Sequence, residues 1–378
     1  MRRVGEEGGR AELRVTIVLG TRPQIIKSAP VFQAFVRAGV ECDIINTGQH
    51  YDYEMNRGFF KELDLPDPSA DLNVGQGTPS EQVSAIVGRL GKEFAARKPD
   101  LAVVPGDTNS ALAAGVACSK SGVPSAHLEA GCRSGDARMA EEVNRRVLDH
   151  ASQVLLCPTA GCVGNVRSEK VLAESITNVG DTMYDSLLRF IPSVDRTDAA
   201  AAHGLEDGGY AFMTLHRAET ADDPGTLKEV LRTVSGLGVP VAFSVHPRTR
   251  ERMREFGIEP GPAVELLGPL PYVETLSLVK RSRFVVTDSG GLQKEAYWLG
   301  KPVLVAREST EWGEIVKTGA AFLVGTSASG IRSGFRKVAG VKKGAFSSSR
   351  RIFGSGNASE NAARAVMRYL ARAAKGTR

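Results

Sequence analysis

Short apolar runs alternate with segments of helical spacing along most of the chain. Each run is rich in Val, Ile and Leu and stops at a Gly, Pro, Asp or Ser, a pattern typical of buried parallel strands. Strand–helix alternation of this kind predicts doubly wound α/β sheets. In the first half the predicted strands are Arg14–Leu19, Glu41–Thr47, Leu101–Pro105, Pro124–Leu128, Gln153–Cys157 and Ile176–Val179.

The alternation is interrupted at Ser193–Gly209, a stretch rich in Ala, Asp and Gly that predicts a domain boundary. The same pattern then resumes. The predicted strands of the second half are Tyr210–Leu215, Val239–Val245, Val264–Leu267, Phe284–Asp288, Pro302–Ala306 and Phe322–Val324. We expect a flexible extension at 1–12, Rossmann-like domains at 13–192 and 193–357, and a helix at 358–378 that packs back on the body.

Length and charge narrow the class of protein. A chain of 378 residues is too long for one compact core and fits two α/β domains. The net charge of +5 is modest and concentrated near the chain ends, so a nucleic-acid partner is not expected. No apolar run approaches the roughly 20 residues of a membrane span, and no signal-peptide pattern follows the start. We therefore expect a cytoplasmic protein without a membrane partner.

The five cysteines have neither the spacing of a zinc site nor that of a disulfide framework. We interpret them as reduced, mostly buried small hydrophobic residues, and we expect no bound metal. Cys132 is the exception to watch, because it lies in a loop with candidate functional residues.

The stretch Phe284–Gly300 has the clearest functional pattern. A buried strand, Phe284–Asp288, runs into Ser289-Gly290-Gly291, and a helix follows. Glycines at a strand-to-helix turn allow close approach of an anion, and the free N–H groups of the helix start suit a diphosphate. Glu295, about one turn into the helix, would reach ribose hydroxyls. The alternative is an ordinary βα turn without a ligand.

Polar residues collect at the other predicted strand ends as well. Ligands of parallel sheets bind beyond the carboxyl ends of the strands. The two halves together would hold a molecule with a charged centre and a neutral part that needs acid–base chemistry, as in a nucleotide-diphosphate sugar. The candidates are Arg22, Lys27, Gln49, His50, Asp107, Glu129, Arg133, His216, Arg217, His246, Arg248 and the Ser289 turn.

Several of these residues also have a purely structural interpretation. Lys27 alone is more typical of a solvated side chain, and Asp107 of a cap for the next helix. The charges of Glu141-Glu142 and Arg145-Arg146 would form surface pairs on most helices. Tyr297 and Trp298 are expected to pack in the core.

Taken in order, the motifs resemble those of the non-hydrolysing UDP-N-acetylglucosamine 2-epimerases, which have the two-domain glycosyltransferase-B type of fold. The resemblance covers about Val15 to Gly325, and the motifs are specific as a set. They are Gly20-Thr21-Arg22-Pro23, Thr47-Gly48-Gln49-His50, Pro105-Gly106-Asp107-Thr108, His127-Leu128-Glu129-Ala130-Gly131, Glu141-Glu142-Val143-Asn144-Arg145, Leu215-His216-Arg217, His246-Pro247-Arg248 and Thr287-Asp288-Ser289-Gly290-Gly291.

The resemblance implies reversible conversion of UDP-N-acetylglucosamine to UDP-N-acetylmannosamine without a cofactor, usually by a homodimer. UDP is eliminated to give 2-acetamidoglucal and is then re-added after protonation of the opposite face. Such a reaction needs a base, an acid, cations for the leaving diphosphate and enclosure from water.

The resemblance also implies roles for individual residues, carried over by motif. Asp107, Glu129 and Glu141 match the acid–base carboxylates, and which of them acts on which face stays open. His216 matches the active-site histidine, and Lys27 and Arg145 match cations near the sugar and diphosphate. The residues that match the UDP site are Arg22, Arg217, His246, Tyr272 (against uracil), Ser289, Gly290, Gly291 and Glu295. Gln49 and His50, again with His246, resemble positions that some bacterial members use for a second, activating UDP-N-acetylglucosamine.

Three departures from the family pattern stand out. Gln24 replaces a common Glu, and Trp312 occupies a position often held by Arg. Lys294 replaces a common Glu, and its helical spacing predicts an exposed side chain of no consequence.

Two rival hypotheses stay open. The first is an enzyme with another outcome, either a hydrolysing epimerase that releases N-acetylmannosamine or an epimerase for a UDP-diacetamido-uronic acid sugar. The second is a glycosyltransferase or a non-catalytic nucleotide-sugar-binding regulator, for which three carboxylates and a histidine are more acid–base groups than are needed.

Overall fold

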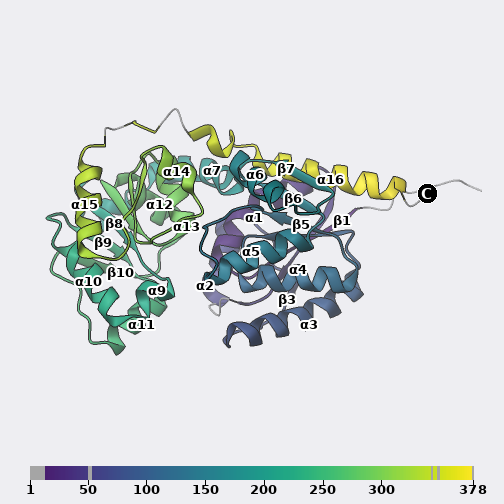
Figure 1. Ribbon diagram of the computed structural model, residues 1–378, viewed down its shortest axis with the longest axis horizontal. Helices are drawn as coiled ribbons and strands as arrows, with labels where there is room; N and C mark the ends of the chain where they lie inside the picture. Colours follow the sequence, from purple (N-terminus) through teal and green to yellow (C-terminus); the bar gives the residue numbers. More distant parts are fainter. Residues whose placement is uncertain (1–12, 50–52, 342–343, 347–349, 377–378) are drawn as a thin grey trace, which may run out of the picture.

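The computed structural model describes residues 13–49, 53–341, 344–346 and 350–376. Within these residues the chain forms two parallel sheets, each covered by helices on both faces (Figure 1). We call the first sheet and its helices the N-terminal half, and the second sheet and its helices the C-terminal half. The predicted pair of doubly wound α/β units is confirmed.

The sheet of the N-terminal half has the strand order β3-β2-β1-β4-β5-β6-β7, and all pairs are parallel. Side chains alternate between its faces, as the pleat requires. Ile17 of β1 faces one core cluster, whereas Val18 faces another. The strands are β1 (Arg14–Leu19), β2 (Glu41–Asn46), β3 (Ala70–Asp71), β4 (Leu101–Pro105), β5 (Ser125–Leu128), β6 (Val154–Cys157) and β7 (Ser175–Asn178).

Helices α3, α4 and α5 pack against one another beside this sheet, and α1 packs with α7 and α16. Thr78 begins α3 with a capping box, a signal readable from its spacing to Glu81. The helices that follow these strands are α1 (Arg22–Arg37), α2 (Tyr53–Glu62), α3 (Pro79–Arg97), α4 (Asn109–Ser121), α5 (Ala140–Ala151), α6 (Ala160–Ser168), α7 (Thr182–Arg196) and α8 (Ala199–Ala202).

The sheet of the C-terminal half has the strand order β10-β9-β8-β11-β12-β13, again with parallel pairs. Its strands are β8 (Ala211–Thr214), β9 (Val241–Ser244), β10 (Val264–Leu267), β11 (Phe284–Thr287), β12 (Val303–Val305) and β13 (Ala321–Leu323). Its helices are α9 (Ala218–Ala221), α10 (Pro224–Ser235), α11 (Pro247–Glu255), α12 (Tyr272–Arg281), α13 (Gly290–Trp298), α14 (Gly313–Lys317) and α15 (Ala328–Ala339), followed by a 3₁₀ turn (Arg350–Phe353) and α16 (Ala358–Gly376).

The two halves share a hydrophobic core. One cluster of buried side chains includes Leu19 of β1, Leu187 of α7, Tyr297 of α13 and Val366 of α16. Helix α7 packs against both α1 and α12, and α16 runs back along the N-terminal half (Figure 1). Apolar burial therefore joins the halves along the side of α7 and α16.

Each sheet has one point at which the strand order reverses, between β1 and β4 in the first and between β8 and β11 in the second. Loops leave in opposite directions there, which opens a crevice at the carboxyl ends of the strands. The crevice residues are Gly20 and Asp107 in the N-terminal half, and His216 and Ser289 in the C-terminal half. The strand topology and the sequence motifs therefore point to the same residues.

Candidate active site

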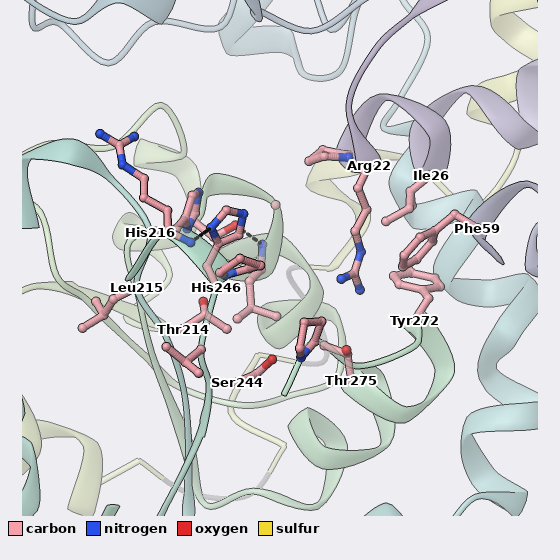
Figure 2. Close-up of a pocket in the computed structure, with 18 of the residues that line it drawn as sticks. Arg22, Ile26, Phe59, Thr214, Leu215, His216, Ser244, His246, Tyr272 and Thr275 are labelled. Atoms are coloured by element: carbon pink, nitrogen blue, oxygen red, sulfur yellow. Dashed lines mark hydrogen bonds between the residues drawn. The ribbon is translucent and has the colours of Figure 1, made fainter. Parts of the chain in front are cut away.

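A cavity of about 870 Å³ lies between the halves at these strand ends. Figure 2 shows Arg22 extending from the N-terminal half toward this space, with His216 and His246 on the opposite side and Phe59 beside Tyr272. A site of this size suits a nucleotide sugar. The predicted residues that line it are Arg22, Gln49, His216, His246, Arg248, Tyr272, Ser289, Gly291 and Glu295, whereas Lys27, Asp107, Glu129, Glu141 and Arg145 are not among its lining residues.

The turn into α13 has the geometry of an anion site. Ser289 is the N-cap, and its Oγ accepts a hydrogen bond from the Leu292 N–H at 3.4 Å. The amides before Leu292 have no partner within the helix and point out of its positive end. A Cβ on Gly290 would lie only 2.2 Å from Glu311 Oε1, so a side chain is excluded there. Gly290 is therefore needed for the close packing of this turn against the Glu311 carboxylate.

Arg22 and Glu295 bring opposite charges to the cavity. The Arg22 guanidinium lies 4.1 Å from the centre of the Phe59 ring, which holds it at the end of β1. Burial raises the pKa of Glu295 to about 7, although the Tyr272 hydroxyl and Arg22 favour its ionised form. Glu295 therefore titrates in the neutral range and is suited to recognise hydroxyl groups.

Asp288 is a site residue that sequence reasoning missed. It is fully buried, and its Oδ2 accepts the N–H groups of His216 and Arg217, each at 2.9 Å. Its Oδ1 lies 3.0 Å from Nδ1 of His216. Burial alone would raise the pKa of Asp288, but His216 and these amides hold it below its usual value. A charged residue at the end of an apolar strand was the available signal.

Asp107 and Arg145 form an ion pair just beyond the end of β4, and neither residue is among those that line the cavity. Arg145 is only 2% exposed and also contacts Glu142 at 3.1 Å and Glu311 at 3.7 Å. The alternative role of Asp107 as a helix cap is wrong, because Thr108 caps α4. Its carboxylate is instead paired with the Arg145 guanidinium and is partly exposed.

Glu129 is held by two lysines. Its Oε2 pairs with Lys27, and its Oε1 accepts from Lys294 Nζ at 2.7 Å. Burial alone would raise the pKa of Glu129, but the two ammonium groups outweigh it and hold the pKa well below its usual range. Glu129 also has φ of 79°, a left-handed conformation that is uncommon outside glycine. The fold thus keeps an ionised carboxylate at this position.

Both lysines depart from expectations for a solvated residue. The hypothesis of a solvated Lys27 is wrong, since it is 7% exposed. The prediction of an exposed Lys294 is also wrong, because its side chain is fully buried against Asp181 at 2.6 Å and Glu129. Helical spacing failed here because α13 is buried on every side from Leu292 to Trp298.

The Glu141–Glu142 pair divides between two environments. Glu142 is buried and bonded to Ser134 and Arg145, whereas the Glu141 side chain is 38% exposed and lies 3.7 Å from Arg217 across the cleft. The predicted i,i+4 contact of Glu142 with Arg146 is present at 3.5 Å, but the expectation of a surface pair is wrong, because the Glu142 side chain is buried. Glu141 instead faces the C-terminal half.

Gln24 and Gln49 fix the strand ends. Gln24 accepts from the Gly20 N–H at 2.9 Å and donates to the Pro105 carbonyl at 2.7 Å, a donation that a carboxylate could not make. Gln49 Oε1 accepts from the Ser110 N–H at 2.8 Å. His50 lies outside the described residues. His246 caps α11 by accepting from the Arg248 N–H at 3.3 Å.

The cysteines are free thiols, and all but Cys42 are buried, as predicted. Sγ of Cys132 lies 3.4 Å from that of Cys162, and burial raises the pKa of Cys132 well above its usual value.

Tyr297 and Trp298 are core residues, as expected. Among the described residues, no cluster of His, Cys, Asp or Glu is arranged to hold a metal ion, and no helix is both long and apolar enough to span a membrane.

Together, these features define a two-domain α/β protein with a cavity between its halves and a cluster of carboxylates that are paired with cations. A family model described as UDP-N-acetylglucosamine 2-epimerase matches residues 34–367, and the chain belongs to this family.

Two relatives and one solved structure illustrate the similarity. A UDP-N-acetylglucosamine 2-epimerase of Methanocaldococcus jannaschii is 37% identical over 83% of this chain and 88% of its own. A UDP-2,3-diacetamido-2,3-dideoxy-D-glucuronate 2-epimerase of Pseudomonas aeruginosa is 37% identical over 95% of this chain and all of its own. A crystal structure of the Methanocaldococcus jannaschii UDP-GlcNAc 2-epimerase in complex with UDP-GlcNAc and UDP has a TM-score of 0.89 and 35% identity, covering 94% of this chain and 100% of that one.

Proposed function

We propose that this protein is a non-hydrolysing epimerase that interconverts UDP-N-acetylglucosamine and UDP-N-acetylmannosamine. The C-terminal half binds UDP at the Ser289 turn, with Arg22 supplied from the N-terminal half. The N-terminal half supplies the carboxylates Asp107, Glu129 and Glu141. The family and the relative from Methanocaldococcus jannaschii support this substrate.

The chemistry proceeds by elimination and re-addition. A carboxylate takes the C2 proton while the bond from C1 to the UDP oxygen breaks, and 2-acetamidoglucal and UDP remain bound. A proton is returned to the other face of C2, and UDP adds again to C1. The α13 amides and nearby arginines stabilise the diphosphate as it leaves. Glu129 acts in its ionised form, because Lys27 and Lys294 hold its pKa low.

One observation carries the proposal. Helix α13 begins at the anion turn, and Lys294 of the same helix contacts Glu129 of the N-terminal half at 2.7 Å. The distance between the turn and the carboxylate is therefore limited to about one helical turn plus two side chains. A sugar attached to a diphosphate at the turn lies within reach of the acid–base groups.

The relative from Pseudomonas aeruginosa favours a second candidate substrate, UDP-2,3-diacetamido-2,3-dideoxy-D-glucuronate, because its alignment covers more of both chains. Incubation with each nucleotide sugar, followed by NMR of the products, separates the two. We expect UDP-N-acetylmannosamine from UDP-N-acetylglucosamine. Turnover of the uronate sugar alone would reassign the substrate, and free N-acetylmannosamine would reassign the enzyme as hydrolysing.

We further propose a cytoplasmic homodimer, which rests on the resemblance of the motifs to the family. Light scattering after size-exclusion chromatography would give the mass of two chains, and the mass of one chain would contradict it. Activation by a second substrate molecule at Gln49, His50 and His246 is part of the same proposal, and it predicts a sigmoidal dependence of rate on substrate concentration.

A further inference from the structure

Lys294 is buried where the two halves meet, and the reaction scheme uses it only to keep Glu129 ionised. Its side chain is fully buried, and Nζ contacts Asp181 at 2.6 Å and Glu129 at 2.7 Å. The remaining side of the ammonium group lies 4.1 Å from the centre of the Trp312 ring. An enclosed ammonium of this kind is costly unless it is fully paired, so its position is specific.

The lysine joins elements from both halves. It lies on α13 next to Glu295, which lines the nucleotide cavity. Its two acceptors belong to the N-terminal half, Glu129 after β5 and Asp181 at the start of α7. A movement of α13 is therefore transmitted directly to the Glu129 carboxylate.

The local charges balance only when Lys294 is included. Lys27 from α1 and Lys294 from α13 face Glu129, and Asp181 faces Lys294. The Cys132 thiol, in the loop after β5, is also within the field of Glu129, and burial keeps it protonated. Without Lys294, two buried carboxylates would share the single ammonium of Lys27.

We propose that Lys294 is a positioning residue for the reaction, which ties the Glu129 carboxylate to the helix that begins at the nucleotide pocket and neutralises its buried charge. The kinetic test of this inference rests on the proposed function. Removal of Lys294 slows the chemical step and moves the titration of Glu129 toward neutral pH. It also removes a charge that favours ionised Glu295, so UDP affinity falls in the single Lys294 variant near neutral pH.

The test compares Lys294→Met, Asp181→Asn and the double variant Asp181→Asn/Lys294→Met. The double variant removes one positive and one negative charge, so Lys27 and Glu129 remain as a balanced pair. Asparagine at position 181 can still cap α7. The double variant can therefore be tested even if the single variant Lys294→Met fails to fold. Thermal melting and UDP calorimetry establish that each variant is folded and binds UDP. Lys294 lowers and Asp181 raises the pKa of Glu295, so the double variant, which lacks both groups, should bind UDP with affinity within about threefold of the parent.

We expect kcat to fall at least about tenfold in both Lys294 variants, with the acid limb of the kcat–pH profile raised by about one pH unit. Asp181→Asn alone should keep kcat within about threefold of the parent value. It should shift the acid limb of the kcat–pH profile by no more than roughly a few tenths of a pH unit. If the double variant has the same kcat and the same pH profile as the parent, the proposal is overturned. Lys294 would then serve only to neutralise the charge of Asp181.

A readout independent of activity separates this inference from the proposed function. Glu129 has a depressed folded pKa, so its stabilising contribution is present above its unfolded pKa of 4.5 and is lost as the pH falls below it. The free energy of unfolding of Asp181→Asn should therefore fall more steeply below pH 4.5 than that of the double variant. Equal slopes contradict the inference, even if the parent turns over neither nucleotide sugar.

Discussion

At the scale of single residues, the site contrasts carboxylates that are fixed as anions with one that titrates. Glu129 and Asp288 are buried but held ionised by cations or amides. Glu295 has too little compensation, and burial raises its pKa to about 7. The sequence identified Glu129 and Glu295 by motif, but the partners that set their pKa values come from distant segments. Lys294 was misjudged for that reason.

The acid–base role of the carboxylates predicts a loss of turnover without a loss of binding. Asp107→Asn, Glu129→Gln and Glu141→Gln should each lower kcat at least about a hundredfold while UDP still binds. Steady-state kinetics and calorimetry measure both effects. Glu265→Gln, exposed on β10, serves as the control and should leave both unchanged. Full activity in all three variants would remove the proposed roles.

Glu295 predicts a pH dependence of UDP binding. Ribose hydroxyls donate to the carboxylate, so UDP binding favours its ionised form, and affinity should rise as the pH rises through about 7. A UDP phosphate also titrates near pH ~6, so the same titration of Glu295→Gln supplies the baseline. Calorimetry in two buffers should detect proton release in the parent that the variant lacks. Affinity that falls with pH relative to the variant would contradict the ribose contact.

The raised pKa of Glu295 has the opposite effect on the free energy of unfolding of the protein without ligand. A carboxyl whose folded pKa is raised above 4.5 stabilises the protein most below pH 4.5, and this contribution is lost as the pH rises through about 7. Denaturant unfolding should show the parent losing stability over this range relative to Glu295→Gln. An identical pH dependence of the two proteins would contradict the assignment.

At the scale of elements, helix ends at the cleft are held by residues from the opposite half. Pro271 precedes α12 and offers no side-chain cap. Instead, Glu62 of α2 accepts the N–H groups of Tyr272 at 3.2 Å and Val273 at 2.9 Å. Strand positions were readable from the sequence, and β1, β4 and β10 match their predicted bounds. This cap and the two-residue β3 were not, because neither leaves a local pattern.

Glu62→Ala should lower the free energy of unfolding by about 1–2 kcal/mol, because two amides at the positive end of α12 lose their acceptor. Denaturant unfolding measures the change. Glu41→Ala removes only the exposed pair with Arg14 and should change stability by less than about 1 kcal/mol. Equal effects of the two substitutions would show that the Glu62 cap does not stabilise α12.

At the scale of the whole molecule, the site exists only where the halves meet. The shared core along α7 and α16 holds one side of the interface. Ion pairs cross the cleft on the other side, from Arg145 to Glu311 and from Arg217 to Glu141, each at 3.7 Å. Periodicity predicted both sheets and their strand-end residues. It could not predict how one sheet faces the other, because that depends on contacts between residues that lie far apart in the sequence.

The central claim is that the C-terminal half binds a uridine diphosphate. Carboxylates of the N-terminal half remove the C2 proton of the attached sugar and return a proton to the opposite face. Incubation of the protein with UDP-N-acetylglucosamine in deuterated water tests it most directly, with NMR and mass spectrometry of the recovered nucleotide sugars. The account predicts UDP-N-acetylmannosamine carrying one deuterium at C2. Epimerised product that retains protium at C2, or no epimerised product from a folded protein that binds UDP, would contradict it.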